Sequence, residues 1–113
     1  MNIIYVFHCA FEDTSTHVAT VRVENLTIME GLEYAFRWTQ NIEDSWSMKG
    51  QLDGNDAVTV EAPLHQKKDG SPLGLRSTSV GDRMWINGLT YQVEGSGFRL
   101  MDSTASLINP IAN

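Results

Sequence analysis

The dipeptide Asn87-Gly88, set between two segments of alternating polarity, constrains the fold of this chain more than any other feature. Both central positions of a type I′ turn need a positive φ angle, so Asn-Gly between alternating segments is typical of a tight β-hairpin. Closure around this dipeptide predicts a register that pairs Ile86 with Leu89, Trp85 with Thr90, Met84 with Tyr91 and Asp82 with Val93.

This register gives the hairpin a core face and a polar face. The core face carries Met84, Ile86, Leu89, Tyr91 and Val93. The polar face carries Arg83, Trp85, Thr90 and Gln92. The turn residues 95–97 lead into a third strand over 98–101, so we expect residues 82–101 to form a β-meander.

Further strands are predicted nearer the N-terminus. Residues 3–9 are rich in β-branched and aromatic side chains, which predicts a strand buried on both faces. Residues 18–24 alternate, which predicts a half-buried strand paired with the first, and one face carries Val18, Thr20, Arg22 and Glu24. Residues 57–61, Ala-Val-Thr-Val-Glu, are also predicted to form a strand, which Pro63 ends.

One helix is predicted between these strands. Thr27 and Glu30 have the spacing of a capping box, in which a hydroxyl and a carboxylate satisfy each other's free backbone N–H groups. Apolar residues at positions 28, 32, 35 and 36 follow the spacing of one helical face. Asn41 is a suitable left-handed stop, so the helix should run from about residue 28 to residue 40.

These elements predict an α+β fold, with one helix packed on an antiparallel sheet of five to six strands. A chain of 113 residues fits one domain, and we assign residues 1–102 to it. Residues 103–113, which include Pro110, are expected to form a flexible C-terminal tail. Residues 64–80 show little periodicity, and a loop of that length is either functional or flexible.

Composition bounds the environment and the partners. Fourteen acidic against eight basic side chains give a net charge of −6, which argues against direct binding to a nucleic-acid backbone. A single cysteine, Cys9, cannot form an internal disulfide and indicates a reducing compartment. The N-terminal apolar run is short, lacks basic residues and is broken by His8, so we expect a cytoplasmic protein with no membrane span.

Catalytic and metal-binding patterns are weak. His8, Cys9, His17 and His65 are scattered, and adjacent residues of a strand point to opposite faces. A nucleophilic Cys9 would need a partner histidine and an electropositive setting, and the sequence indicates neither. We therefore expect a protein that is not an enzyme and that uses no metal and no cofactor.

Two polar clusters are the candidate binding residues, for a small polar ligand or for a partner's backbone. The first begins at the end of the predicted helix, continues past it, and comprises Thr39, Gln40, Asn41 and Trp46. The second precedes the hairpin and comprises Arg76, Ser77, Ser79 and Asp82. Their structural alternative is that Asn41 caps the helix while the serines and Asp82 shape turns. Trp85 on the polar face is a further candidate, because a lone exposed tryptophan can anchor a partner.

The segment 77–98 resembles the C-terminal signature of YodL-like domains, which occur in small proteins of phages and mobile elements, sometimes near antirestriction modules. The matching positions are Ser77, Ser79, Val80, Asp82, Tyr91, Val93, Gly97 and Phe98. The segment 36–47 is also similar to a stretch found upstream in such phage proteins. Trp85 within the first hairpin strand departs from the family pattern. The resemblance implies a phage or mobile-element accessory protein and brings no catalytic residues.

These observations lead to three functional hypotheses. The first is a non-enzymatic phage or mobile-element accessory protein that binds a host protein or signal in the host cytoplasm, to counter defence or redirect host processes. The second is a small-ligand or nucleotide-binding module, which requires the two polar clusters to converge on one concave surface. The third is a structural component of a homo-oligomer or larger assembly that pairs through an exposed sheet edge.

Overall fold

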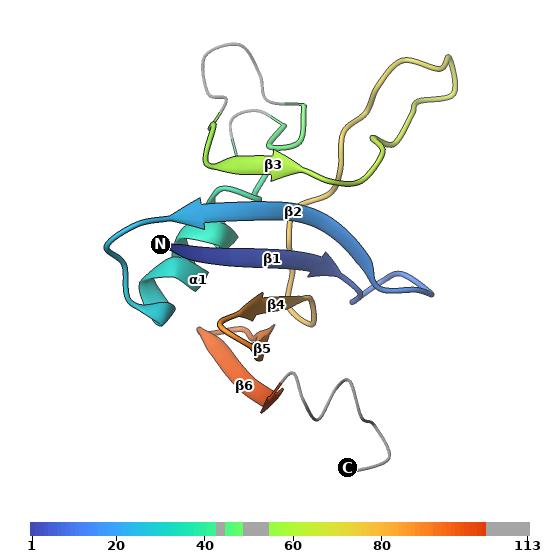
Figure 1. Ribbon diagram of the computed structural model, residues 1–113. Coiled ribbons are helices and arrows are strands. Elements are labelled where there is room, and N and C mark those ends of the chain that lie inside the picture. Colours follow the sequence, from blue (N-terminus) through green and yellow to red (C-terminus); the bar gives the residue numbers. More distant parts are fainter. Residues whose placement is uncertain (43–44, 49–54, 104–113) are drawn as a thin grey trace.

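A six-stranded antiparallel sheet with one helix against one face forms the fold (Figure 1), in a computed structural model that describes residues 1–42, 45–48 and 55–103. The strands are β1 (Asn2–His8), β2 (Thr16–Val23), β3 (Val58–Val60), β4 (Arg83–Ile86), β5 (Leu89–Val93) and β6 (Phe98–Ser103). The helix α1 (Ile28–Arg37) follows β2. The strands lie in the order β3-β2-β1-β4-β5-β6, which confirms the predicted α+β class.

The C-terminal meander has the predicted register. Asn87 and Gly88 have φ angles of 51° and 76°, as a type I′ turn requires. Met84 lies opposite Tyr91 and Trp85 lies opposite Thr90. Strand β6 continues to Ser103, one residue into the predicted tail, and the rest of that tail, 104–113, lies outside the described residues.

The N-terminal strands pair as predicted, but two details of their burial were wrong. Strand β1 buries only one face, which carries Ile4, Val6 and His8, while the Tyr5 side of the strand is partly exposed. The reason is that α1 covers one side of the sheet only. Val18 belongs to the core and not to the polar face of β2, because a bulge between β1 and β2 shifts the alternation at that point.

The helix begins at the predicted capping box. The Thr27 hydroxyl accepts a hydrogen bond from the Glu30 N–H at 3.2 Å, and the Glu30 carboxylate accepts one from the Thr27 N–H at 2.9 Å. This reciprocal pair satisfies two of the N–H groups that the first turn leaves free.

The helix ends at Arg37, three residues earlier than predicted. The Thr39 hydroxyl donates a 2.8 Å hydrogen bond to the carbonyl of Ala35, and the next backbone bonds span three residues instead of four. Asn41 does not have a left-handed backbone, so its predicted role as a helix stop was wrong.

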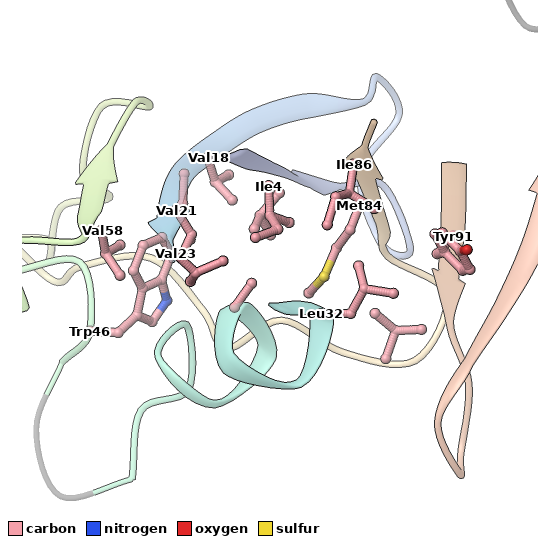
Figure 2. Close-up of a cluster of buried hydrophobic side chains, with 14 of the residues drawn as sticks. Ile4, Val18, Val21, Val23, Leu32, Trp46, Val58, Met84, Ile86 and Tyr91 are labelled. Atoms are coloured by element: carbon pink, nitrogen blue, oxygen red, sulfur yellow. The ribbon is translucent and has the colours of Figure 1, made fainter. Parts of the chain in front are cut away.

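The core lies between α1 and one face of the sheet (Figure 2). Gly31 is buried on the side of the helix that faces the sheet, where a Cβ atom would lie 3.4 Å from Ile4 Cδ1. Leu32 projects from the helix among side chains of the sheet. The buried apolar residues include Ile4, Val21, Leu32, Val58, Met84 and Ile86. We call the opposite side of the sheet, which points away from α1, the open face.

Within the described part of the chain, no helix is long and apolar enough to cross a membrane.

Candidate functional site

The two polar clusters predicted from the sequence lie against each other. The Asn41 amide donates to the carbonyl of Leu75 at 2.9 Å, and its backbone N–H donates to the Ser77 hydroxyl at 2.8 Å. The Gln40 amide donates to the carbonyl of Thr78 at 2.8 Å. The Trp46 indole donates to the carbonyl of Arg76 at 2.9 Å.

These hydrogen bonds consume the groups that a ligand would need. Thr39 is fully buried, and its carbonyl accepts from the N–H of Thr78. Trp46 is buried, and its backbone N–H donates to the side-chain oxygen of Asn41. The Ser79 hydroxyl donates to the carbonyl of Ser77. We call residues 39–41, 46 and 75–79 the helix–loop clamp, because together they fasten the segment before β4 to the end of α1.

Asp82 is the centre of a second network beside this clamp. Its side chain is 0% exposed, and one carboxylate oxygen accepts from the backbone N–H groups of Cys9 at 2.8 Å and Ala10 at 2.9 Å. The other oxygen accepts from the N–H of Ser79 at 2.7 Å. The Arg76 guanidinium donates to both oxygens, at 2.7 and 2.8 Å.

Arg76 also binds a second carboxylate. Its Nε and Nη2 donate to Glu12 at 3.0 and 2.8 Å, and its guanidinium carbon lies 4.9 Å from the centre of the Phe11 ring. One arginine therefore holds the β1–β2 loop, the segment before β4 and Asp82 in one arrangement. Bidentate geometry of this kind suits the planar guanidinium and not a lysine.

The environment of Asp82 favours its charged form. Burial opposes ionisation, but the hydrogen bonds from Arg76 and from the backbone of Ala10, Ser79 and Cys9 outweigh it and hold the pKa of Asp82 below its ordinary value. The Arg76 hydrogen bonds likewise lower the pKa of Glu12. Both oxygens of Asp82 are therefore occupied by hydrogen bonds from within the chain.

Cys9 sits at the edge of the same network. Burial, and then the charge of Asp82, raise the pKa of the Cys9 thiol, and its sulfur donates to the carbonyl of Gly81 at 3.3 Å. A raised pKa keeps the thiol protonated and weakens it as a nucleophile. Among the described residues, no three His, Cys, Asp or Glu side chains gather as a metal site would require.

His8 closes a buried chain of hydroxyl groups. The Thr39 hydroxyl donates to the Ala35 carbonyl, and the Thr78 hydroxyl donates to Thr39 at 2.8 Å. With its one proton used, Thr78 can only accept from His8 Nε2, which lies 2.9 Å away. The direction of these hydrogen bonds therefore places the proton of the neutral His8 imidazole on Nε2.

The burial of His8 predicts a stability change near neutral pH. Desolvation lowers the pKa of His8 below 6.5, against the opposing charge of Asp82, so the unfolded chain binds a proton that the folded chain does not. This contribution is complete above about pH 6.5 and is lost as the pH falls toward the folded pKa. We expect urea unfolding to give a smaller free energy at pH 5.5 than at pH 7.5.

The matched variant is His8→Gln, which keeps a side-chain N–H donor but cannot titrate. We expect it to be less stable at pH 7.5 and to lose less stability between the two pH values. An equal loss in the variant and the unchanged protein would contradict the assignment to His8.

The open face carries a row of aromatic side chains at the middle of the sheet. Trp85 and Tyr5 lie opposite each other on neighbouring strands, and each is 37% exposed. The Phe7 ring lies 5.1 Å from Trp85 on one side and 5.1 Å from His17 on the other. His17 also meets Tyr5 edge-on at 5.7 Å. We call Tyr5, Phe7, His17 and Trp85 the aromatic row.

Only Trp85 of this row was a predicted site residue. Tyr5 and Phe7 alternate with the core residues of β1, but the expectation that this strand is buried on both faces hid them. The pairing of β1 with β4, which brings Tyr5 beside Trp85, joins segments about eighty residues apart. The alternation itself was the signal that could have separated the two faces.

Arginine side chains border the aromatic row. Arg83 precedes Trp85 on the same face of β4 and lies opposite Phe7. Its Nε is buried and has no hydrogen-bond partner among the described residues. On the other side of β1, Arg22 of β2 is exposed, and its Nη1 donates to the Thr59 hydroxyl at 2.8 Å.

Comparisons with protein-family models, with curated proteins and with solved structures give no significant match for this chain. The chain is a small α+β domain with an internally satisfied polar network on one side of the sheet and an uncovered aromatic row on the other.

Proposed function

We propose that this chain is a non-enzymatic binding protein whose contact surface for a partner protein is the open face of the sheet. One observation carries the proposal: Trp85 and Tyr5 are partly exposed side by side on the face that α1 does not cover. Tryptophan, tyrosine and arginine are the residues that most often dominate the energy of protein interfaces. Arg22 and Arg83 complete that composition on the same face.

The helix–loop clamp supports this choice over a small-ligand site. The two clusters converge, as the ligand hypothesis requires, but their donors and acceptors bind one another. A ligand at the clamp would have to break several of these hydrogen bonds, and each buried group left unpaired would cost about 1–3 kcal/mol. The open face instead leaves part of the Trp85 and Tyr5 rings exposed.

The resemblance to YodL-like phage proteins supports the biological setting that we propose. In our proposal the chain is a phage or mobile-element accessory protein that binds a host protein in the cytoplasm and blunts a defence or another host process. Deletion from the parent element should then reduce its growth or maintenance in a host that carries the target.

Replacing Trp85 with alanine tests the contact surface. The substitution should weaken the affinity for a protein captured from host lysate by at least about 30-fold, as expected for a central interface anchor worth 2 kcal/mol or more. The measurement is the dissociation constant of the purified pair. Met29→Ala is the matched control, because Met29 is an exposed apolar residue on the helix, away from the open face. An unchanged affinity in Trp85→Ala, with the fold intact by circular dichroism, would overturn the proposal.

A further inference from the structure

The five arginines of this chain differ in their partners, and Arg37 lies over the Trp38 ring on the helix. Arg76 pairs with Glu12 and Asp82, and Arg99 pairs with Glu94. Arg22 and Arg83 form no ion pair with any carboxylate of the described residues. In a chain with fourteen acidic and eight basic side chains, carboxylates are in excess. Arg22 and Arg83 are therefore two guanidinium groups without a carboxylate partner that lie on the same open face.

Arg83 is better suited than Arg22 to bind an anion. Its Nε has lost contact with water without gaining an acceptor. On the same face, the hydroxyl of Thr90 is also buried without a partner among the described residues, and Thr90 is 1% exposed and lies opposite Trp85. A partly desolvated guanidinium gains more from a carboxylate than a fully hydrated one does, because less water must be removed on binding.

The two arginines flank the aromatic row on opposite sides of β1. Arg22 lies opposite Ile3 and Arg83 lies opposite Phe7, four residues further along the strand. Strand geometry separates their Cα positions by about 13 Å along β1 and about 10 Å across it. The 2.8 Å hydrogen bond to Thr59 holds the Arg22 side chain on the β3 side. An occupant would therefore meet an apolar centre with Arg83 on one flank and Arg22 on the other. On the Arg22 side, the Glu61 carboxylate is already engaged by the Thr20 hydroxyl at 2.6 Å.

We infer that the partner at this face is an acidic protein segment, with an apolar side chain packed on Trp85 and Tyr5 and carboxylates bound to Arg22 and Arg83. This inference rests on the proposed function and names the chemistry of the same surface. Guanidinium forks match carboxylates in geometry. The net charge of −6 opposes a continuous polyanion such as a nucleic acid more than it opposes a few carboxylates placed at the two arginines.

The test is selection from a displayed library of random 12-residue peptides on the immobilised protein, with counter-selection on Trp85→Ala. Enriched peptides should carry aspartate or glutamate on both sides of an aromatic or aliphatic residue. Synthetic copies should bind at least 10-fold more weakly to Arg22→Gln and to Arg83→Gln, and more weakly as salt rises. Arg37→Gln is the control, because Arg37 lies over Trp38 on the helix.

The outcomes separate this inference from the proposed function. Peptides that depend on Trp85 but carry no acidic residues, or that bind the arginine variants unchanged, would overturn the inference and leave the contact surface in place. No Trp85-dependent peptide at all would overturn both. A labelled 15-nucleotide oligo(dT) that binds the protein and is lost in Arg83→Gln would replace the acidic segment with a nucleic acid. Arg22→Gln keeps the comparison valid if Arg83→Gln does not fold, since Arg22 is exposed.

Discussion

Asp82→Asn is expected to lower the free energy of unfolding by about 3–5 kcal/mol, the usual cost of removing one partner of a buried ion pair. Both oxygens of the fully buried Asp82 accept hydrogen bonds. One accepts from the N–H groups of Cys9 and Ala10, the other accepts from the N–H of Ser79, and Arg76 donates to both. An asparagine has one acceptor oxygen, so its amide group would face donors whichever way it is turned. The network cannot adapt by a simple side-chain flip.

Urea unfolding at pH 7 measures this effect. Asp69→Asn is the control, because Asp69 also accepts hydrogen bonds, from Ser71, but is fully exposed in a loop. We expect it to change stability little. The pKa of Asp82 lies below its ordinary value of about 4, so its contribution is present above that pH and is lost as the pH falls. Equal unfolding curves for Asp82→Asn and the unchanged protein would show that the network carries no net stability.

Leu32→Ala is expected to cost about 2–5 kcal/mol, the range for truncating a large aliphatic side chain in a packed core. Leu32 is fully buried, and it fills the space between α1 and the sheet where Ile4 and Met84 also lie (Figure 2). With one helix in the fold, no second helix is present among the described residues to move into the cavity. The loss should therefore lie in the upper part of the range.

An alanine substitution on the exposed side of the helix separates the effect of core packing on stability from the effect of helix propensity. Met29→Ala removes a side chain that is partly exposed, and alanine favours the helix slightly more than methionine does. Thermal unfolding of the two variants should differ by several degrees or more, with Leu32→Ala the lower. Similar midpoints would mean that the core tolerates the cavity.

Local signals in the sequence predicted local structure well. The hairpin at Asn87-Gly88 and the capping box at Thr27 each depend on residues within a few positions of one another, and both were confirmed. The end of the helix was wrong because Thr39 bonds back to Ala35, a choice that depends on its burial against Thr78. Helix propensity depends on local sequence and cannot predict the contact between Thr39 and Thr78.

The candidate site shows the same limit at longer range. The sequence singled out Arg76, Asp82 and Trp85, but it could not show what each of them contacts. Asp82 meets Cys9 across 73 positions of the chain, and this pairing turns a cluster that suits a ligand into a structural network. Tyr5 beside Trp85 is a product of the β1–β4 register, which no local pattern fixes.

The position of β1 between β2 and β4 has a consequence for folding during synthesis. Strand β1 is made first, yet one of its edges pairs with β4, so that Ile4 lies opposite Ile86. Contacts so distant in sequence close slowly, because the loop between them must be ordered first. Until β4 has left the ribosome, β1 and β2 present an unpaired edge and an unfinished core. We therefore expect chains truncated before β4 to aggregate and not to fold as fragments.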